Sequence, residues 1–272
     1  MYDDHTAELI ITADGETKNI VFVEDLIDAA PSLDNWKFTA LKQAKSLEDN
    51  SIQMGEYEFN SQNITFIDNS NSSRPDEINL IFSHPDLNEK NHNAIGNGIY
   101  IFLDNFLGEL KLLTSVDQVL FEPLDNKEHT LNPISKLPEF LNWKEKEFIE
   151  KYEGKRKDTE NDPHITLEAQ TSDGLPLFAV INDELLNWDS KPSHPWIAIL
   201  ELSYSANENG LPDSDTLEKI HQFTNELLTE LKDEEGYLYF GSQTSNGIRT
   251  LFFACKEFRY SSKVLDLSLI HI

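Results

Sequence analysis

The chain has 272 residues, and its 49 Asp and Glu residues against 22 Lys and Arg residues give a formal net charge of −27. The length exceeds the ~100–200 residues of a typical domain, so we expect two domains. Hydrophobic residues make up 39% of the chain, which excludes wholesale disorder, and eleven Gly with eleven Pro exclude collagen-like and low-complexity classes.

The excess of acidic residues bears on possible partners. A surface of this charge repels nucleic-acid phosphates and anionic lipids, so we expect neither nucleic-acid nor membrane binding. No stretch approaches the ~20 apolar residues of a membrane-spanning helix. Acidity by itself keeps a protein soluble, and a basic protein surface is the partner that it would attract.

Cys255 is the only cysteine, so an intramolecular disulfide is impossible and a cysteine-based zinc site is implausible. It ends the apolar run Leu251–Cys255, which predicts a buried, inert thiol. The start of the chain is acidic and has no secretory apolar segment. Together these features predict a reducing, cytoplasmic location.

Both ends of the chain are unusual. A strand-like segment begins almost at once, at Glu8, as if an earlier part were missing. The tail Leu267–Ile272 is similar to translated sequencing-adapter sequence, and we expect these six residues to carry no evolved information.

A highly charged stretch from Glu150 to Pro163 marks the clearest boundary, because it has no apolar period and ends in Pro. We therefore predict an N-terminal α+β domain over residues 1–150, a charged linker over 151–163 and a C-terminal domain over 164–272. The two parts share the acidity, with net charges of −17 for residues 1–150 and −10 for residues 151–272.

In the N-terminal half, short apolar runs predict a series of strands. They cover Leu9–Thr12, Trp36–Leu41, Glu56–Phe59, Ile64–Ile67, Ile78–Phe82 and Val116–Phe121. The runs 56–59 and 64–67 are interpreted as one hairpin. Helices are predicted over Val23–Ala30 and Leu137–Tyr152. The run Gly98–Glu109 could be a strand or a helix, and helix is favoured because its apolar residues share one helical face and Gly108 can end it.

The C-terminal half predicts strands at Pro176–Ile181, Trp196–Tyr204, Tyr237–Gln243 and Ile248–Cys255. Between the second and third lies a strongly amphipathic helix, Asp215–Lys232, which we expect Asp215 and Glu218 to cap as a capping box. Asn246-Gly247 predicts a hairpin between the last two strands. This order is typical of antiparallel sheets with helices on one face.

Several residues in this half together resemble the bacterial domain-of-unknown-function family 695, over roughly residues 170 to 266. They are Trp196, Tyr204, Asn209-Gly-Leu-Pro212, Tyr239-Phe-Gly241, Thr244-Ser-Asn-Gly247, Arg249 and Phe253. That family is compared with the regulator-of-ribonuclease-activity B domain, an acidic ferredoxin-like inhibitor of a degradative ribonuclease. The resemblance implies a ferredoxin-like C-terminal fold and no activity that could be assigned to particular residues.

Motifs for familiar chemistry are absent from the sequence. There is no Gly-x-Ser-x-Gly elbow, no phosphate-binding glycine loop and no His-Glu-x-x-His helix, so we predict no catalytic constellation, no metal site and no cofactor. His84, Asp86 and His92 are close enough in sequence to suggest a divalent-metal site, but a solvated loop is the favoured interpretation.

Two sets of residues remain as candidate sites. The aromatic residues Trp196, Tyr204, Tyr237 and Tyr239 could line an exposed sheet face and, with Arg249, form a recognition surface, although cross-strand packing is the commoner fate of such tyrosines. Asp104 and Glu109 could be paired acid–base carboxylates. The competing interpretation is that Asp104 bonds a neighbouring backbone group while Glu109 faces water.

The sequence therefore favours a non-catalytic protein-binding or regulatory module with an acidic surface. The alternative hypothesis is an enzyme of unrecognised type with Asp104 and Glu109 at its centre, which would place both carboxylates in a concave pocket with shifted pKa values.

Overall fold

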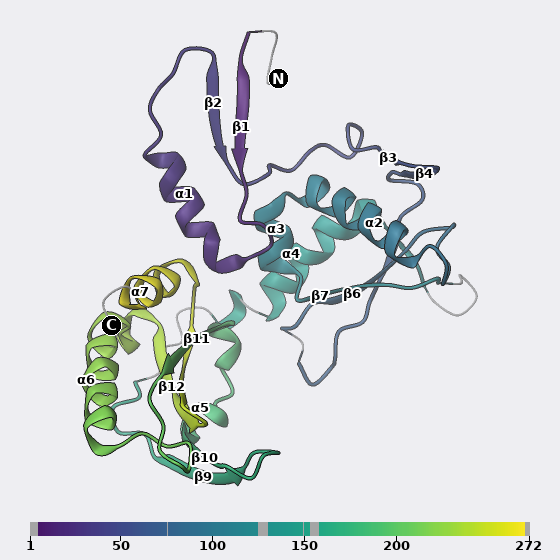
Figure 1. Cartoon of the computed structure of the whole chain (residues 1–272). Coiled ribbons are helices and arrows are strands. Elements are labelled where there is room, and N and C mark those ends of the chain that lie inside the picture. The colour runs from purple at the N-terminus through teal and green to yellow at the C-terminus, as the bar shows by residue number, and fades with distance from the viewer. Residues whose placement is uncertain (1–4, 75, 125–129, 149, 153–157, 270–272) are drawn as a thin grey trace. The chain divides into compact units, whose positions relative to one another are not determined.

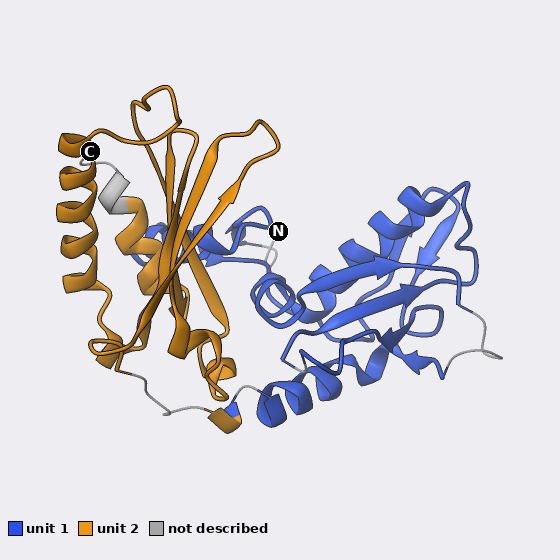
Figure 2. Cartoon of the chain, turned by 90° about the horizontal axis from the view of Figure 1, so that it is seen from below, with its two compact units in different colours: residues 1–150 blue, residues 151–272 orange. Residues whose placement is uncertain are grey.

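The chain divides into two compact units, residues 1–150 and residues 151–272 (Figure 2). A computed structural model describes residues 5–74, 76–124, 130–148, 150–152 and 158–269. Each unit combines helices with sheets, which confirms the two-domain α+β class. Part of the predicted linker, residues 153–157, and residues 270–272 of the tail lie outside the described residues. In the described ranges, no helix has both the length and the apolar character needed to cross a bilayer.

The first unit begins with a β-α-β arrangement (Figure 1). Strands β1 (Ala7–Ile11) and β2 (Trp36–Ala40) pair in parallel, and the short helix η1 (Thr17–Asn19) and helix α1 (Ile20–Asp28) connect them. The pair is parallel because a helical crossover returns the chain to the same end of the ribbon.

A hairpin of β3 (Ile52–Met54) and β4 (Tyr57–Phe59) follows. The predicted pairing of residues 56–59 with 64–67 is wrong. Gly55 has a φ of +63°, which allows a tight turn directly after β3, so β4 folds back onto β3.

The main sheet of this unit has four strands in the order β7-β6-β5-β8. They are β5 (Thr65–Asp68), β6 (Asn79–Ser83), β7 (Gln118–Phe121) and β8 (Asn132–Pro133). The β6–β7 pair is parallel, because helices α2 and α3 connect these strands. The first unit therefore contains both parallel and antiparallel strand pairs, whereas the sequence predicted only antiparallel sheets.

Helices of this unit pack with the sheet in one hydrophobic core. The helices are α2 (His92–Leu107), α3 (Glu109–Ser115), α4 (Leu137–Phe148) and the short η2 (Ile134–Lys136). The short η3 (Glu150–Tyr152) spans the boundary between the two units and has no buried residue. Phe66 and Phe82 from the sheet meet Phe102 and Leu103 from α2 in this core, and all four are fully buried. The helix favoured over Gly98–Glu109 is thus confirmed, and it ends at Gly108, whose φ is +79°.

The second unit is a five-stranded sheet in the order β11-β13-β12-β10-β9, antiparallel throughout. The strands are β9 (His164–Gln170), β10 (Pro176–Asn182), β11 (Trp196–Ser203), β12 (Tyr237–Ser245) and β13 (Ile248–Cys255). Strand β9 was not predicted, although its residues alternate strictly between polar and apolar, as those of a half-buried strand do. The hairpin at Asn246-Gly247 is confirmed, with φ values of 47° and 76°.

Helices α6 (Ser214–Glu230) and α7 (Arg259–Leu269) lie on one side of this sheet, and the short α5 (Asp183–Leu186) lies on the other (Figure 2). Single 3-10 turns, η4 (Lys191–Ser193) and η5 (Asp233–Glu235), precede β11 and β12. The predicted capping box is wrong: the carboxylate of Asp213 accepts the backbone N–H of Thr216, and Asp213 is the N-cap of α6.

Strands β11 and β12 run in the same direction and α6 connects them, while β13 lies between them. This is a split β-α-β arrangement, and the element order β11-α6-β12-β13-α7 matches five of the six elements of a ferredoxin-like unit. Strands β9 and β10 extend the sheet on the β12 side. The sixth element is not among the described elements, so the full ferredoxin-like fold stays a prediction.

Candidate functional site

The aromatic residues that the sequence put forward lie on the helix-covered face of the second unit's sheet. Tyr237 and Tyr239 stand opposite Cys255 and Phe253, and all four side chains belong to or pack against the core beneath α6 and α7. Trp196 packs on Phe258, with ring centroids 4.8 Å apart. These rings therefore stabilise the domain instead of forming an open surface.

Tyr237 has a further structural role at the start of α7. Its hydroxyl donates to Oε1 of Glu257, and the same carboxylate accepts the backbone N–H groups of Arg259 at 2.7 Å and Tyr260 at 3.0 Å. Burial and the neighbouring Glu257 raise the pKa of Tyr237 well above its ordinary value. The tyrosine thus holds the carboxylate that satisfies the first N–H groups of the helix.

Arg249 and Tyr204 also have partners within the unit. Arg249 donates from Nη1 to Oγ1 of Thr244 and from Nη2 to Oγ of Ser242, both at 2.9 Å, so it links β13 to β12. Its Nε is buried without a hydrogen-bond partner. The Tyr204 hydroxyl donates to the backbone oxygen of Gly210 at 2.9 Å. The five residues predicted for binding therefore share one face but do not form one exposed patch.

Cys255 is fully buried, as predicted, and burial raises the pKa of its thiol to about 11. A thiol with such a pKa remains protonated near neutral pH, so it is a packing residue.

The exposed apolar residues of this unit include two on β11. Ile197 is 57% exposed and Ile199 is 55% exposed, and both point away from α6 and α7. Strand β11 lies at the end of the sheet, and no other described strand pairs with its free edge. The sequence did not single out these isoleucines, because Trp196–Leu202 is apolar on both faces and such a pattern is typical of a strand buried on both sides.

The two candidate carboxylates of the first unit converge on Lys42. The Nζ of Lys42 lies 2.6 Å from Oδ2 of Asp104, and the backbone N–H of Lys42 donates to Oε2 of Glu109 at 3.2 Å. The Oε1 of Glu109 accepts the backbone N–H of Ala13 at 2.8 Å. The hydrogen bond to Asp104 raises the pKa of Lys42.

Glu109 is only 4% exposed, so the interpretation in which it faces water is wrong. Both of its oxygens already accept backbone N–H groups, and Asp104 is paired with a cation. The arrangement satisfies buried charges and joins segments far apart in sequence, which is a structural use of carboxylates.

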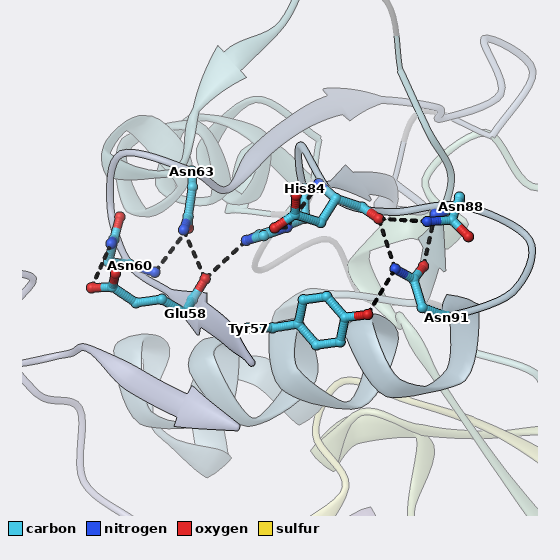
Figure 3. A network of polar contacts seen from close by, with 8 residues as sticks. Tyr57, Glu58, Asn60, Asn63, His84, Asn88 and Asn91 are labelled. Atoms are coloured by element: carbon cyan, nitrogen blue, oxygen red, sulfur yellow. Dashed lines mark hydrogen bonds and ion pairs between the residues drawn. The ribbon is translucent and has the colours of Figure 1, made fainter. Parts of the chain in front are cut away.

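His84 is held by a polar network at the β4 end of the first unit (Figure 3). Its Nε2 lies 2.9 Å from the backbone oxygen of Glu58, and its Nδ1 accepts the backbone N–H of Asp86 at 3.2 Å. Asn91 extends the network by donating to the backbone oxygen of Asp86 at 2.8 Å and to the Tyr57 hydroxyl at 3.3 Å.

These contacts assign the proton of His84 to Nε2, and they occupy the lone pair of Nδ1 that a metal would need. The His84 side chain is 2% exposed, so His84 itself is packed, while most of the loop from Pro85 to His92 is exposed, as the predicted solvated loop requires. His92 lies apart, with its Nε2 2.9 Å from the backbone oxygen of Phe121. In the part of the chain that the structure describes, no group of three or more His, Cys, Asp or Glu residues could hold a metal ion.

Comparison with known proteins adds one finding. Residues 166–272 match the model of a family of unknown function, DUF695, in agreement with the resemblance seen in the C-terminal half. The matched segment includes β10 to β13 and α5 to α7. No curated protein matches the chain, and no solved structure matches it.

Proposed function

We propose that the protein is a non-catalytic binding module whose C-terminal unit contacts another protein through β11. The observation that carries the proposal is the pair Ile197 and Ile199, each more than half exposed on the same face of β11, opposite α6 and α7. Each side chain is already nearly half buried, so covering the rest of it supplies roughly half of the about 1.5–3 kcal/mol that full burial of an isoleucine gives.

The charge of the chain indicates the kind of partner. With a formal net charge of −27, the protein attracts basic surfaces and repels acidic ones over the range of the Debye length. We therefore propose a partner whose contact surface combines apolar and basic residues. The engagement of Asp104 and Glu109 in structural contacts is a further argument for a binding role over an enzymatic one.

The test is affinity capture from a bacterial lysate with the full chain as bait, read by mass spectrometry. A double variant, Ile197→Lys with Ile199→Lys, is compared with a control double variant, Leu167→Lys with Leu186→Lys. The control residues are also exposed apolar residues of the second unit, on β9 and α5, and the two variants change the net charge equally.

The expected result is a partner that the wild-type chain and the control retain and the β11 variant loses. Capture should also weaken at roughly 1 M salt, where the Debye length is about 3 Å. An identical set of captured proteins for the wild-type chain and the β11 variant, or no protein above background for the wild-type chain, would overturn the proposal.

A further inference from the structure

The side chain of Arg249 lies on the helix-covered face of the second unit's sheet. Arg249 is two residues before Leu251 on β13, so the two side chains point to the same face, and Leu251 belongs to the core beneath α6. Strand β13 is paired on both sides, by β11 and by β12. Arg249 therefore lies inside the sheet, and its side chain is partly buried.

Arg249 and its two hydrogen-bond partners have more donors than acceptors. A guanidinium has five N–H groups. Nη1 of Arg249 donates to Oγ1 of Thr244 and Nη2 donates to Oγ of Ser242, while Nε is buried without a partner. Thr244 and Ser242 are buried as well, and no described residue accepts the proton of either hydroxyl group. Buried donors are normally paired, so this cluster lacks an acceptor.

The charge of the cluster is also uncompensated. In the described part of the chain, no carboxylate forms an ion pair with Arg249, although the chain has 49 Asp and Glu residues. Burial removes part of the hydration of a cation, and an anion close to it offsets that cost. An acceptor that is itself negatively charged would therefore satisfy both the free donors and the charge.

The arrangement of the donors indicates the kind of anion. A guanidinium presents its N–H groups in a planar fork that matches the two oxygens of a carboxylate, and hydroxyl groups beside it can donate to the same oxygens. A phosphate fits the same fork but carries up to two charges. A chain with a net charge of −27 repels a dianion more strongly than a monoanion, which favours the carboxylate.

We propose that Arg249, Ser242 and Thr244 form a binding site for a carboxylate group, which accepts hydrogen bonds from the free N–H groups of the guanidinium and from the two hydroxyl groups. The carboxylate belongs to a small organic acid or to the C-terminus of a partner polypeptide, since both present the same two oxygens. This inference goes beyond the proposed function, because Ile197 and Ile199 lie on the opposite face of the sheet.

The direct test follows the Nε–H resonance of Arg249 in the full chain by proton–nitrogen NMR during a titration with sodium acetate. Sodium chloride at the same concentrations is the control for ionic strength. Acetate should shift the resonance along a saturable curve, because a bound carboxylate oxygen accepts a charge-assisted hydrogen bond from the guanidinium. Chloride should produce only a small shift that does not saturate.

Matched variants test the individual groups, with the backbone N–H resonance of Ser242 as the readout. Arg249→Lys keeps the positive charge and removes the planar fork, so it should weaken acetate binding by about tenfold. Thr244→Val removes one hydroxyl group at nearly constant shape and should weaken binding by about threefold, which tests the site even if the lysine variant does not fold. Arg74→Lys is the control, since Arg74 is an exposed residue of the first unit paired with Glu77, and it should bind acetate as the wild-type chain does.

Two further probes distinguish the sources of the carboxylate. They are trialanine with a free C-terminus and trialanine with an amidated C-terminus. Trialanine that binds about tenfold more tightly than acetate, with no binding of the amide, would assign the site to a polypeptide C-terminus. Equal binding of trialanine and acetate would assign it to a small organic acid. Both results support a carboxylate site.

Three results would overturn the inference. They are a response to acetate no larger than the response to chloride, acetate binding that Arg249→Lys and Thr244→Val leave unchanged, and saturable binding of inorganic phosphate without binding of acetate. The last result would assign the site to phosphate. None of them bears on the proposed function, which the capture experiment with the Ile197→Lys, Ile199→Lys variant tests separately.

Discussion

The carboxylate of Glu109 accepts a hydrogen bond from the backbone N–H of Ala13, although 96 residues separate them in the chain. Its second oxygen accepts the backbone N–H of Lys42, two residues after the end of β2. One buried side chain at the start of α3 thus connects the β-α-β segment to the helices of the first unit. This contact explains why a carboxylate that resembles an acid–base candidate in the sequence is buried in the structure.

Replacement of Glu109 should therefore destabilise the protein. Glu109→Ala leaves two backbone N–H groups without their charged acceptor, and we expect the free energy of unfolding to fall by about 2–3 kcal/mol in a urea titration. Glu139→Ala on α4 is the control, since Glu139 is exposed and its ion pair with Lys136 lies at the surface, and it should cost at most about 1 kcal/mol. Equal costs for the two variants would contradict the role assigned to Glu109.

Two glycines with positive φ should differ in their tolerance of alanine. At Gly241, with a φ of +153°, an added Cβ would stand 2.2 Å from the backbone oxygen of Val180, whereas at Gly15, with a φ of +82°, it would meet nothing within 4 Å. Gly15→Ala should cost about 1–2 kcal/mol from its backbone conformation alone. Gly241→Ala should cost about 2 kcal/mol more, because β10 and β12 must move apart. Thermal unfolding of the two variants checks this difference, and similar melting temperatures would refute it.

The N-cap of α6 can be tested by comparing two neighbouring aspartates. Asp213→Ala removes the acceptor for the N–H of Thr216 and should lower the free energy of unfolding by more than Asp215→Ala does. Asp215→Ala removes only a favourable charge in the first turn and should cost about 0.3–0.5 kcal/mol. Chemical denaturation of both variants measures the order, and a larger cost at Asp215 would restore the capping box that the sequence predicts.

The buried His194 should make stability depend on pH. Burial, with a smaller contribution from Lys256, lowers the pKa of His194 below its ordinary value of 6.5. The unfolded imidazole therefore binds a proton as the pH falls through about 6.5, while the folded one stays neutral down to its lower pKa. The unfolded state gains protons in that window, so stability should fall as the pH is lowered through it and should be constant above it.

His194→Gln should remove this part of the pH dependence between about pH 7.5 and pH 5.5. His221→Gln serves as the control, because His221 is exposed on α6. The urea midpoint at several pH values is the measurement, and a pH dependence of the His194→Gln variant equal to that of the wild-type chain would contradict the assignment.

Features that depend on neighbouring residues could be predicted from the sequence. The Asn246-Gly247 hairpin follows from two residues that tolerate positive φ, and the α2 helix follows from an apolar stripe that ends at Gly108. The buried thiol of Cys255 follows from the apolar run that contains it. In each case the sequence within about one helical turn or one strand determines the outcome.

Pairing between distant segments could not be predicted in this way. Lys144 belongs to a charged helix and yet is 5% exposed, because Asp68 on β5 lies 3.1 Å from its Nζ. The pairing of β4 with β3 is different, because Gly55 between these strands is a local turn signal that the predicted hairpin overlooked.

The binding site proposed on β11 depends on both kinds of feature, one that the local sequence determines and one that only the tertiary structure decides. The apolar composition of Trp196–Ser203 by itself determined that this segment is a strand. Only the tertiary structure decided that the strand lies at the edge of its sheet, so that Ile197 and Ile199 are exposed instead of buried. The physical reason is that the order of strands in a sheet depends on contacts between residues that are tens of positions apart, which no local pattern encodes.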